Sequence, residues 1–115
     1  MRSLMKPPRP RHTPGQMNRL EERYSEYLRT LFVTGIVEGY EFEPIKFRLA
    51  QRCFYTPDFM IIHKDHISFI DVKGHIEDDS LVKLKTVATK YPWFEFGLVT
   101  FDRRAGWKHR YFESC

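Results

Sequence analysis

The sequence predicts a single domain of the α/β (α+β) class. Two segments carry apolar residues at helical spacing, and short apolar runs bounded by polar turns lie between and after them. The chain has 115 residues, of which 42% are hydrophobic and 16% aromatic, so it is long enough to bury one small core. We place this domain at residues 18–115.

Residues 1–17 differ from the rest of the chain in composition. They are rich in proline and contain Lys and Arg but no acidic residue, so the remainder is nearly neutral although the whole chain has a net charge of +4. We expect a disordered or polyproline-like basic arm. Such an arm either attracts nucleic acid without sequence preference or serves only as a solubilising tail.

The first helix is expected at residues 18–33, with Gly35 as its stop signal. Its apolar stripe comprises Leu20, Tyr24, Tyr27, Leu28 and Leu31. Glu21 lies at the edge of this stripe, whereas Glu22 and Glu26 face solvent. A carboxylate at position 21 either stabilises the helix start through the macrodipole or belongs to a functional site.

Residues 36–55 are expected to form the first strand of the sheet. Pro44 marks an edge or a bend in this segment, and residues 50–53 supply a turn. Lys46 and Arg48 share one face of the strand. They are candidates for phosphate contacts in a DNA complex, and the alternative is an ordinary solvated face.

The next two apolar runs, residues 59–62 and 67–73, are separated by a polar turn of four residues. Such a short connection predicts a hairpin of antiparallel neighbouring strands. The hairpin brings Asp71, near the end of the second strand, beside Asp58, which precedes the first. Because side chains alternate along a strand, Asp71 and Lys73 share a face.

Two carboxylates and a lysine in apolar surroundings are costly unless they are paired or bind a cation. Carboxylate oxygens are typical ligands of Mg²⁺, and a bound ion activates water and offsets charge on a phosphoryl group. Lys73 can orient or deprotonate the attacking water, or neutralise the charge that develops. The pattern therefore predicts metal-dependent hydrolysis of a phosphodiester, with Mg²⁺ or Mn²⁺ as the cofactor.

A second helix is expected to start at Asp79 or Ser80, both good N-caps, and to end near residue 90. Its buried stripe is Leu81, Leu84, Val87, Ala88 and Tyr91. Lys83 and Lys85 lie on other faces of this helix. They are candidates for DNA contacts, with plain solvent exposure as the alternative.

The last part of the domain is expected to be extended. Residues 94–101 form a strand, and aromatic and basic residues alternate in residues 106–112, which fits an edge strand or a nucleic-acid contact. Lys108 and Arg110 are the candidate phosphate contacts there. Core packing of Trp107 and Tyr111 is the alternative use of that segment.

The other reactive side chains show no recognisable site. Cys53 and Cys115 lack metal-ligand spacing, which favours a reduced intracellular protein. The histidines form no zinc pattern, and His75 is expected at the surface. No segment resembles a signal peptide or is long enough to span a membrane, so a cytoplasmic location is expected.

Pro57-Asp58, followed after a gap of twelve residues by Asp71-Val72-Lys73, resembles the signature of the PD-(D/E)XK nuclease superfamily. The resemblance covers about residues 18–101. More narrowly, the chain is similar to small phage-encoded, nuclease-like or junction-resolvase-like endonucleases. This resemblance implies a restriction-endonuclease-like αβββαβ core with a mixed central sheet.

The resemblance also implies roles for individual residues. Asp58 and Asp71 would be metal ligands, the Val72 carbonyl an additional ligand, and Lys73 the catalytic lysine. Many members carry an acidic residue on the first helix that completes the metal site. Glu21 is our first choice for that residue and Glu22 our second.

The expected function is therefore that of a Mg²⁺- or Mn²⁺-dependent DNA endonuclease, with branched DNA in phage recombination, repair or processing as a candidate substrate. The resemblance further implies a homodimer that cuts both strands, in the host cell cytoplasm if the chain is phage-encoded. The alternative is a non-catalytic DNA-binding or assembly factor that keeps the nuclease fold.

Overall fold

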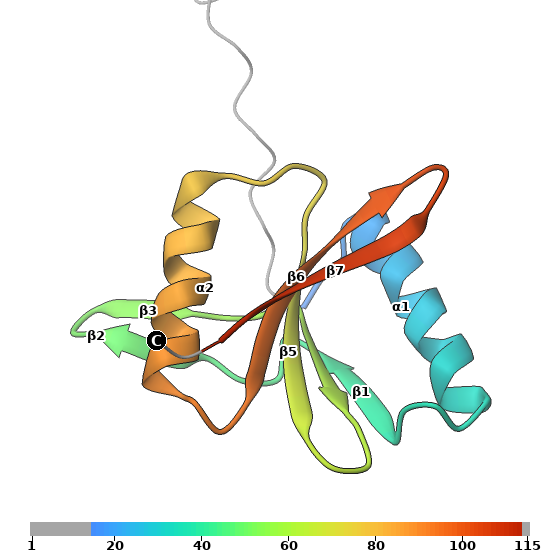
Figure 1. Cartoon of the computed structure of the whole chain (residues 1–115), viewed down its shortest axis with the longest axis horizontal. Helices are drawn as coiled ribbons and strands as arrows, with labels where there is room; N and C mark the ends of the chain where they lie inside the picture. Colours follow the sequence, from blue (N-terminus) through green and yellow to red (C-terminus); the bar gives the residue numbers. More distant parts are fainter. Residues whose placement is uncertain (1–14, 114–115) are drawn as a thin grey trace, which may run out of the picture.

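The computed structural model describes residues 15–113, so the expected basic arm falls largely outside the described residues. Within them the chain forms two helices and seven strands (Figure 1). In chain order these are α1 (Arg19–Val33), β1 (Gly39–Phe42), β2 (Phe47–Ala50), β3 (Cys53–Tyr55), β4 (Phe59–Ile62), β5 (Ile67–Val72), α2 (Asp78–Lys90), β6 (Glu95–Asp102) and β7 (Gly106–Phe112). No helix in this described part is long and apolar enough to cross a membrane.

Five strands form one central sheet in the order β1-β4-β5-β6-β7. β5 and β6 are parallel and are joined through α2, whereas the other neighbouring pairs are antiparallel. The fold is therefore α+β with a mixed central sheet, as predicted. When β2, β3 and β7 are set aside, the order α1-β1-β4-β5-α2-β6 matches the expected αβββαβ order.

The prediction for residues 36–55 was wrong in one respect. β2 does not start the central sheet but pairs with β3 in a separate two-stranded sheet, and β1 is the edge strand of the central sheet. Glu43 has a φ of 47° and precedes Pro44, so the chain turns away between β1 and β2. The expected turn at residues 50–53 is present between β2 and β3, with Arg52 at a φ of 59°.

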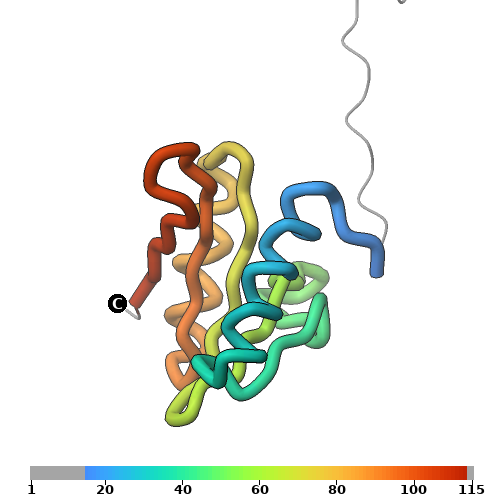
Figure 2. The backbone as a smooth tube through the Cα atoms, turned by 90° about the vertical axis from the view of Figure 1, so that its right-hand side faces the viewer, coloured from blue at the N-terminus to red at the C-terminus, as the bar shows by residue number. Residues whose placement is uncertain are grey.

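The central sheet lies between two covering layers (Figures 1 and 2). α1 covers one face, while α2 and the β2–β3 hairpin cover the other. Because side chains alternate, β5 serves both cores, with Phe69 on the α2 side and Ile70 on the α1 side. The buried residues on the α2 side are Phe47, Leu49, Tyr55, Phe69, Leu84, Val87, Ala88, Phe96 and Leu98. Those on the α1 side are Tyr24, Leu28, Val37, Phe59, Ile61, Ile70, Val72 and Val99.

α1 begins with a reciprocal capping box. The Asn18 side chain accepts a hydrogen bond from the Glu21 N–H at 2.8 Å, and the Glu21 carboxylate accepts one from the Asn18 N–H at 2.9 Å. The helix ends before Gly35, whose φ of 81° suits glycine. Both ends of α1 therefore agree with the prediction.

α2 begins slightly earlier than predicted. Its N-cap is Glu77, which has an extended backbone and makes no side-chain cap hydrogen bond, so the choice of Asp79 or Ser80 was wrong. Asp78 and Asp79 instead lie in the first turn, where the macrodipole favours carboxylates. The helix thus starts without the side-chain cap on which the prediction relied.

β7 is an edge strand that pairs with β6. Trp107 is half-buried, with its ring centroid 5.0 Å from that of Tyr24, whereas Tyr111 is 45% exposed. Core packing was therefore the wrong expectation for Tyr111. Its ring instead covers Gly97 on β6, where a Cβ atom would come within 2.7 Å of the ring.

Candidate active site

Asp58 and Asp71 are held together across the β4–β5 hairpin. The Asp58 N–H donates a hydrogen bond to Asp71 Oδ1 at 3.2 Å, and the Val72 N–H donates one to Asp58 Oδ2 at 2.8 Å. Each carboxylate is thus positioned by the backbone of the other strand. The turn of four residues predicted this proximity correctly.

Lys73 lies beside Asp71 on the α2 side of the sheet. Its Nζ atom is 3.7 Å from Asp71 Oδ2, and its side chain is 28% exposed whereas that of Asp71 is 6% exposed. Asp71 therefore has a partly solvated ammonium group, that of Lys73, next to its carboxylate. The two carboxylates and the lysine all face the same side of the sheet, because they line one pocket.

Glu21 brings a third carboxylate to this end of the sheet. α1 starts near the end of β5, since Gly74 lies against the Leu20 side chain. Glu21 is buried, with 4% exposure, and its charge is close enough to raise the pKa of Asp58. It is therefore both the N3 member of the α1 capping box and a neighbour of the carboxylate pair, whereas Glu22 is exposed.

Burial dominates the electrostatics of the pair. It raises the pKa of Asp58, and the charges of Asp71 and Glu21 raise it further, while the Val72 N–H and Lys73 oppose the shift. Burial also raises the pKa of Asp71, with Lys73 as the main opposing group. At Asp58 the charges of two further carboxylates, Asp71 and Glu21, act against that of Lys73, so a divalent cation would remove a large part of this repulsion.

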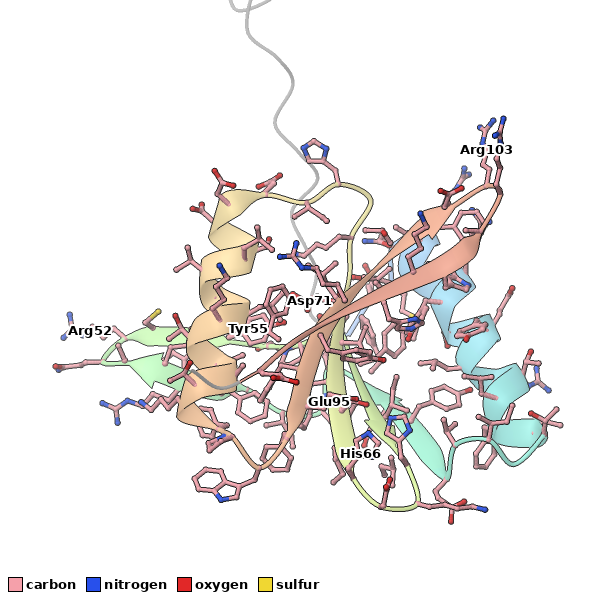
Figure 3. All side chains as sticks on the ribbon, in the orientation of Figure 1. Arg52, Tyr55, His66, Asp71, Glu95 and Arg103 are labelled. Carbon is pink, nitrogen blue, oxygen red and sulfur yellow. The ribbon has the colours of Figure 1, made fainter. Side chains whose placement is uncertain are left out.

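Tyr55, at the end of β3, brings a buried hydroxyl to the same place (Figure 3). Burial and the Asp71 carboxylate, through its charge and a side-chain hydrogen bond, raise the pKa of Tyr55 well above the ordinary value. This hydrogen bond is loose, because the Tyr55 hydroxyl makes no contact of strict hydrogen-bond geometry with a described residue. A water or a ligand held between Tyr55 and the carboxylates would complete its hydrogen bonding.

A pocket of about 260 Å³ opens over these groups. It is lined by Phe54, Tyr55, Thr56, Asp58, Asp71, Lys73, Asp79, Ser80 and Lys83. An adjacent hollow of about 520 Å³ shares Lys73 and Ser80 with it and extends along the loop that follows β5. Together the two hollows form an open groove between the carboxylates and the start of α2.

The predicted basic residues are distributed unevenly around this pocket. Lys83 lines it, whereas Lys85 lines a separate hollow with Thr86, Thr89 and Lys90. Lys46 lies over the ring of Phe54, 4.6 Å from its centroid, and so lies near the rim. The exposed Arg48 side chain does not line the pocket.

The two candidates on β7 lie farther away. Arg110 is in register with Leu98, which is in register with Asp71, so it is two strands or roughly 10 Å from that carboxylate. Its guanidinium lies 5.0 Å from the centroid of the Phe112 ring. Lys108 forms an ion pair with Asp102 at 3.3 Å. Neither residue lines the pocket.

Five pocket residues were not identified as site residues from the sequence: Phe54, Tyr55, Thr56, Asp79 and Ser80. Asp79 and Ser80 were interpreted as helix caps, and Tyr55 fell at the end of the segment expected to be a strand. Asp79 and Lys83 are four residues apart on α2 and therefore lie on one face of it. That spacing was a usable signal, but only once α2 was known to lie over the pocket.

The structure also contains a second group that could hold a metal ion. One potential ligand atom from each of His63, His66 and Glu95 lies within 4.8 Å of the others. The expectation that the histidines form no metal pattern was therefore incomplete, because the third member comes from β6. His75 is exposed, as predicted.

The chain matches no protein-family model, no curated protein and no solved structure. The pocket combines the Asp58 and Asp71 carboxylates with two lysines, Lys73 and Lys83, and a buried tyrosine hydroxyl. Such a set of groups suits a hydrated divalent cation and a phosphate group.

Proposed function

We propose that the chain is a Mg²⁺- or Mn²⁺-dependent DNA endonuclease of the PD-(D/E)XK type. The observation that carries this proposal is the convergence of Asp58, Asp71 and Lys73 in one pocket, with each aspartate held by the other strand. The chain order of the core elements supports it.

Asp58 and Asp71 would hold the ion, with the Val72 carbonyl and Glu21 as further candidates. When bound, the ion would lower the pKa of a water molecule and offset charge on the phosphoryl group. Lys73 would orient the attacking water as an ammonium group, or deprotonate it as a neutral amine, since its Nζ atom lies beside Asp71 and its side chain is partly solvated. Lys83 would contact a phosphate from the opposite wall of the pocket.

The Tyr55 hydroxyl has a place in the same scheme. It is buried, lies next to Asp71 and makes no hydrogen bond of strict geometry to a described residue. A water molecule in the pocket would satisfy it, and the hydroxyl would then help to orient that water. Tyr55 is therefore a positioning residue in this proposal.

DNA is the proposed partner, and the resemblance to the nuclease superfamily suggests a homodimer that cuts both strands. A non-catalytic DNA-binding or assembly factor is the second candidate. The exposed basic side chains on β2, α2 and β7 would contact DNA in a nuclease and in a binding factor alike. Three clustered carboxylates favour the nuclease, because without a metal ion they would repel the phosphates of DNA.

The test is incubation of the full chain with linear and branched DNAs, in Mg²⁺, in Mn²⁺ and in chelator. We expect cleavage only with metal, and no cleavage by Asp71→Ala, while Lys85→Ala serves as a control outside the pocket. Binding of DNA in chelator without cleavage under any metal condition would favour the binding factor. Cleavage by Asp71→Ala at the parent rate would contradict the assignment of the site.

A further inference from the structure

We propose that His63, His66 and Glu95 form a second metal site, here called the turn site, that binds a divalent transition ion such as Zn²⁺. This site is independent of the proposed nuclease function. It lies at the other end of β5 from Asp71 (Figure 3). Five residues of strand separate His66 from Asp71, which corresponds to roughly 16 Å.

Two chain segments supply the turn site. His63 and His66 flank the turn between β4 and β5, and the His63 N–H donates a hydrogen bond to the His66 carbonyl at 2.9 Å. Glu95 is the first residue of β6 and lies opposite Ser68 of β5 in the parallel pairing. The sheet therefore places a carboxylate from β6 beside two imidazoles of the preceding hairpin.

Neighbouring polar groups already hold one nitrogen of each imidazole. Asp65 Oδ1 is 2.7 Å from His66 Nδ1, which leaves His66 Nε2 facing Glu95 Oε1 at 3.2 Å. Ser68 Oγ lies 2.5 Å from His63 Nε2, which leaves Nδ1 as the free nitrogen of His63. Metal-bound histidines are typically oriented by such a partner on the second nitrogen.

The present ring arrangement predicts a movement on binding. The imidazoles of His63 and His66 are stacked, with centroids 4.1 Å apart and planes inclined by 3°. Ring-nitrogen lone pairs lie in the ring planes, so two parallel stacked rings cannot both point at one ion. His66 is the ring that can turn, since its side chain is 40% exposed and its partner Asp65, at 87% exposure, can move with it, whereas His63 is anchored to the buried Ser68.

The donor set indicates which ions would bind. Two imidazoles and one carboxylate suit Zn²⁺ and its neighbours, with one coordination position left for water. Mg²⁺ prefers oxygen ligands and is expected in the Asp58/Asp71 pocket instead. A bound ion would connect the β4–β5 turn to the start of β6, and so stabilise the folded state by selective binding to it.

The test uses the full chain carrying Asp71→Asn, so that the Asp58/Asp71 pocket is disabled and any ion bound reports on the turn site. Zn²⁺ is titrated by calorimetry, and Co²⁺ by visible absorption. We expect one ion per chain, a coordination band of nitrogen and oxygen ligands with Co²⁺, and a higher melting temperature with Zn²⁺. The long-range ¹H–¹⁵N signals of His63 and His66 should shift on Zn²⁺ binding.

Variants identify the ligands. His66→Ala and Glu95→Gln should weaken Zn²⁺ binding at least tenfold, and Asp65→Asn by about tenfold, since such outer partners are typically worth 10–100-fold. His75→Ala, at an exposed histidine outside the cluster, is the matched control and should bind like its parent. His66 is exposed, so its replacement leaves the core intact. Equal affinities for His66→Ala and His75→Ala would overturn the proposal, as would no binding in the Asp71→Asn chain.

Discussion

The Asp58 carboxylate is favoured as a hydrogen-bond acceptor and disfavoured as a charge. Its Oδ2 atom accepts the Val72 N–H at 2.8 Å, while burial and the charges of Asp71 and Glu21 raise its pKa. The hydrogen bond needs only an oxygen, whereas the proposed metal site needs the charge. A substitution that keeps the oxygen and removes the charge therefore distinguishes the hydrogen-bonding role of Asp58 from its proposed role in metal binding.

Asp58→Asn is such a substitution. We expect it to abolish cleavage and, in the absence of metal, to raise the free energy of unfolding by at least about 1 kcal/mol, because one unit of pKa shift corresponds to about 1.4 kcal/mol and the pKa of Asp58 is raised by more than one unit. Chemical denaturation at neutral pH in chelator measures this change. Asp102→Asn is the control, since its neighbours lower the pKa of Asp102 and no gain is expected. A less stable Asp58→Asn would mean that the carboxylates do not repel one another.

Lys83 and Lys85 form a matched pair two residues apart on α2. Lys83 lines the pocket and Lys85 does not, although both side chains are exposed. We expect Lys83→Ala to lower kcat/KM for DNA cleavage by about tenfold, which is the usual magnitude for a charge-assisted hydrogen bond. Lys85→Ala should stay close to the parent. Equal losses would indicate general attraction of DNA instead of a contact in the pocket.

At the scale of elements, the start of α1 couples helix capping to the proposed metal site through Glu21. Its carboxylate accepts the Asn18 N–H and also lies near Asp58. Glutamine keeps the acceptor oxygen but loses the charge. Alanine loses both.

Glu21→Gln should therefore retain the melting temperature of the parent but need more Mg²⁺ for half-maximal cleavage. Glu21→Ala should in addition lose about 1 kcal/mol of stability, which is typical for the loss of a cap. Thermal melts and Mg²⁺ titrations of the cleavage rate measure the two effects, with Glu22→Gln as the exposed control. Parent-like cleavage by Glu21→Gln would remove Glu21 from the site.

The elements that were predicted best from local sequence patterns are strands joined to their neighbour by a short turn. β4 and β5 agree with the prediction because a four-residue turn and two apolar runs determine the hairpin, and Asp58, Asp71 and Lys73 belong to it. β2 was misplaced because the left-handed φ of Glu43 redirects the chain. Glutamate rarely adopts such a conformation without tertiary support. Pro44 indicated an edge or a bend there, but not that the chain leaves the central sheet.

The site residues that were not predicted come from other elements. Tyr55 lines the pocket from the separate β2–β3 hairpin, and Asp79 and Ser80 line it from α2. Glu95 meets His66 only because β5 and β6 pair in parallel. Each of these contacts depends on how elements pack, and apolar periodicity within one element contains no information on that.

At the scale of the whole molecule, the raised pKa values of Asp58 and Asp71 connect stability to pH. In metal-free protein, the folded state holds protons on these groups more tightly than the unfolded state does, because the folded pKa values lie above the ordinary value of 3.8. The free energy of unfolding should therefore fall as the pH rises from about 4 through the raised pKa values. The slope is at most about 1.4 kcal/mol per pH unit for each group.

Denaturation curves across this pH range test the prediction. Burial lowers the pKa of His109 and of His63. Their contribution to the free energy of unfolding therefore rises as the pH increases towards 6.5, whereas the contribution of the two carboxylates falls. Subtracting the Asp58→Asn curve from that of the parent isolates the carboxylates. Saturating Mg²⁺ should flatten the difference, and a difference that is flat already in chelator would contradict the pKa directions.

The central sheet contains pairings of two kinds. The β4–β5 hairpin joins residues that are close in the sequence, whereas the parallel β5–β6 pair joins residues that are far apart in it. Asp58 and Asp71 are 13 residues apart, whereas His66 and Glu95 are 29 residues apart and separated by α2. Hairpins close in microseconds, while parallel pairs must wait for a crossover to form. We expect the carboxylate pair to assemble early during refolding and the turn site late. Pulse-labelled hydrogen exchange would then protect the amides of β4 and β5 before those of β6.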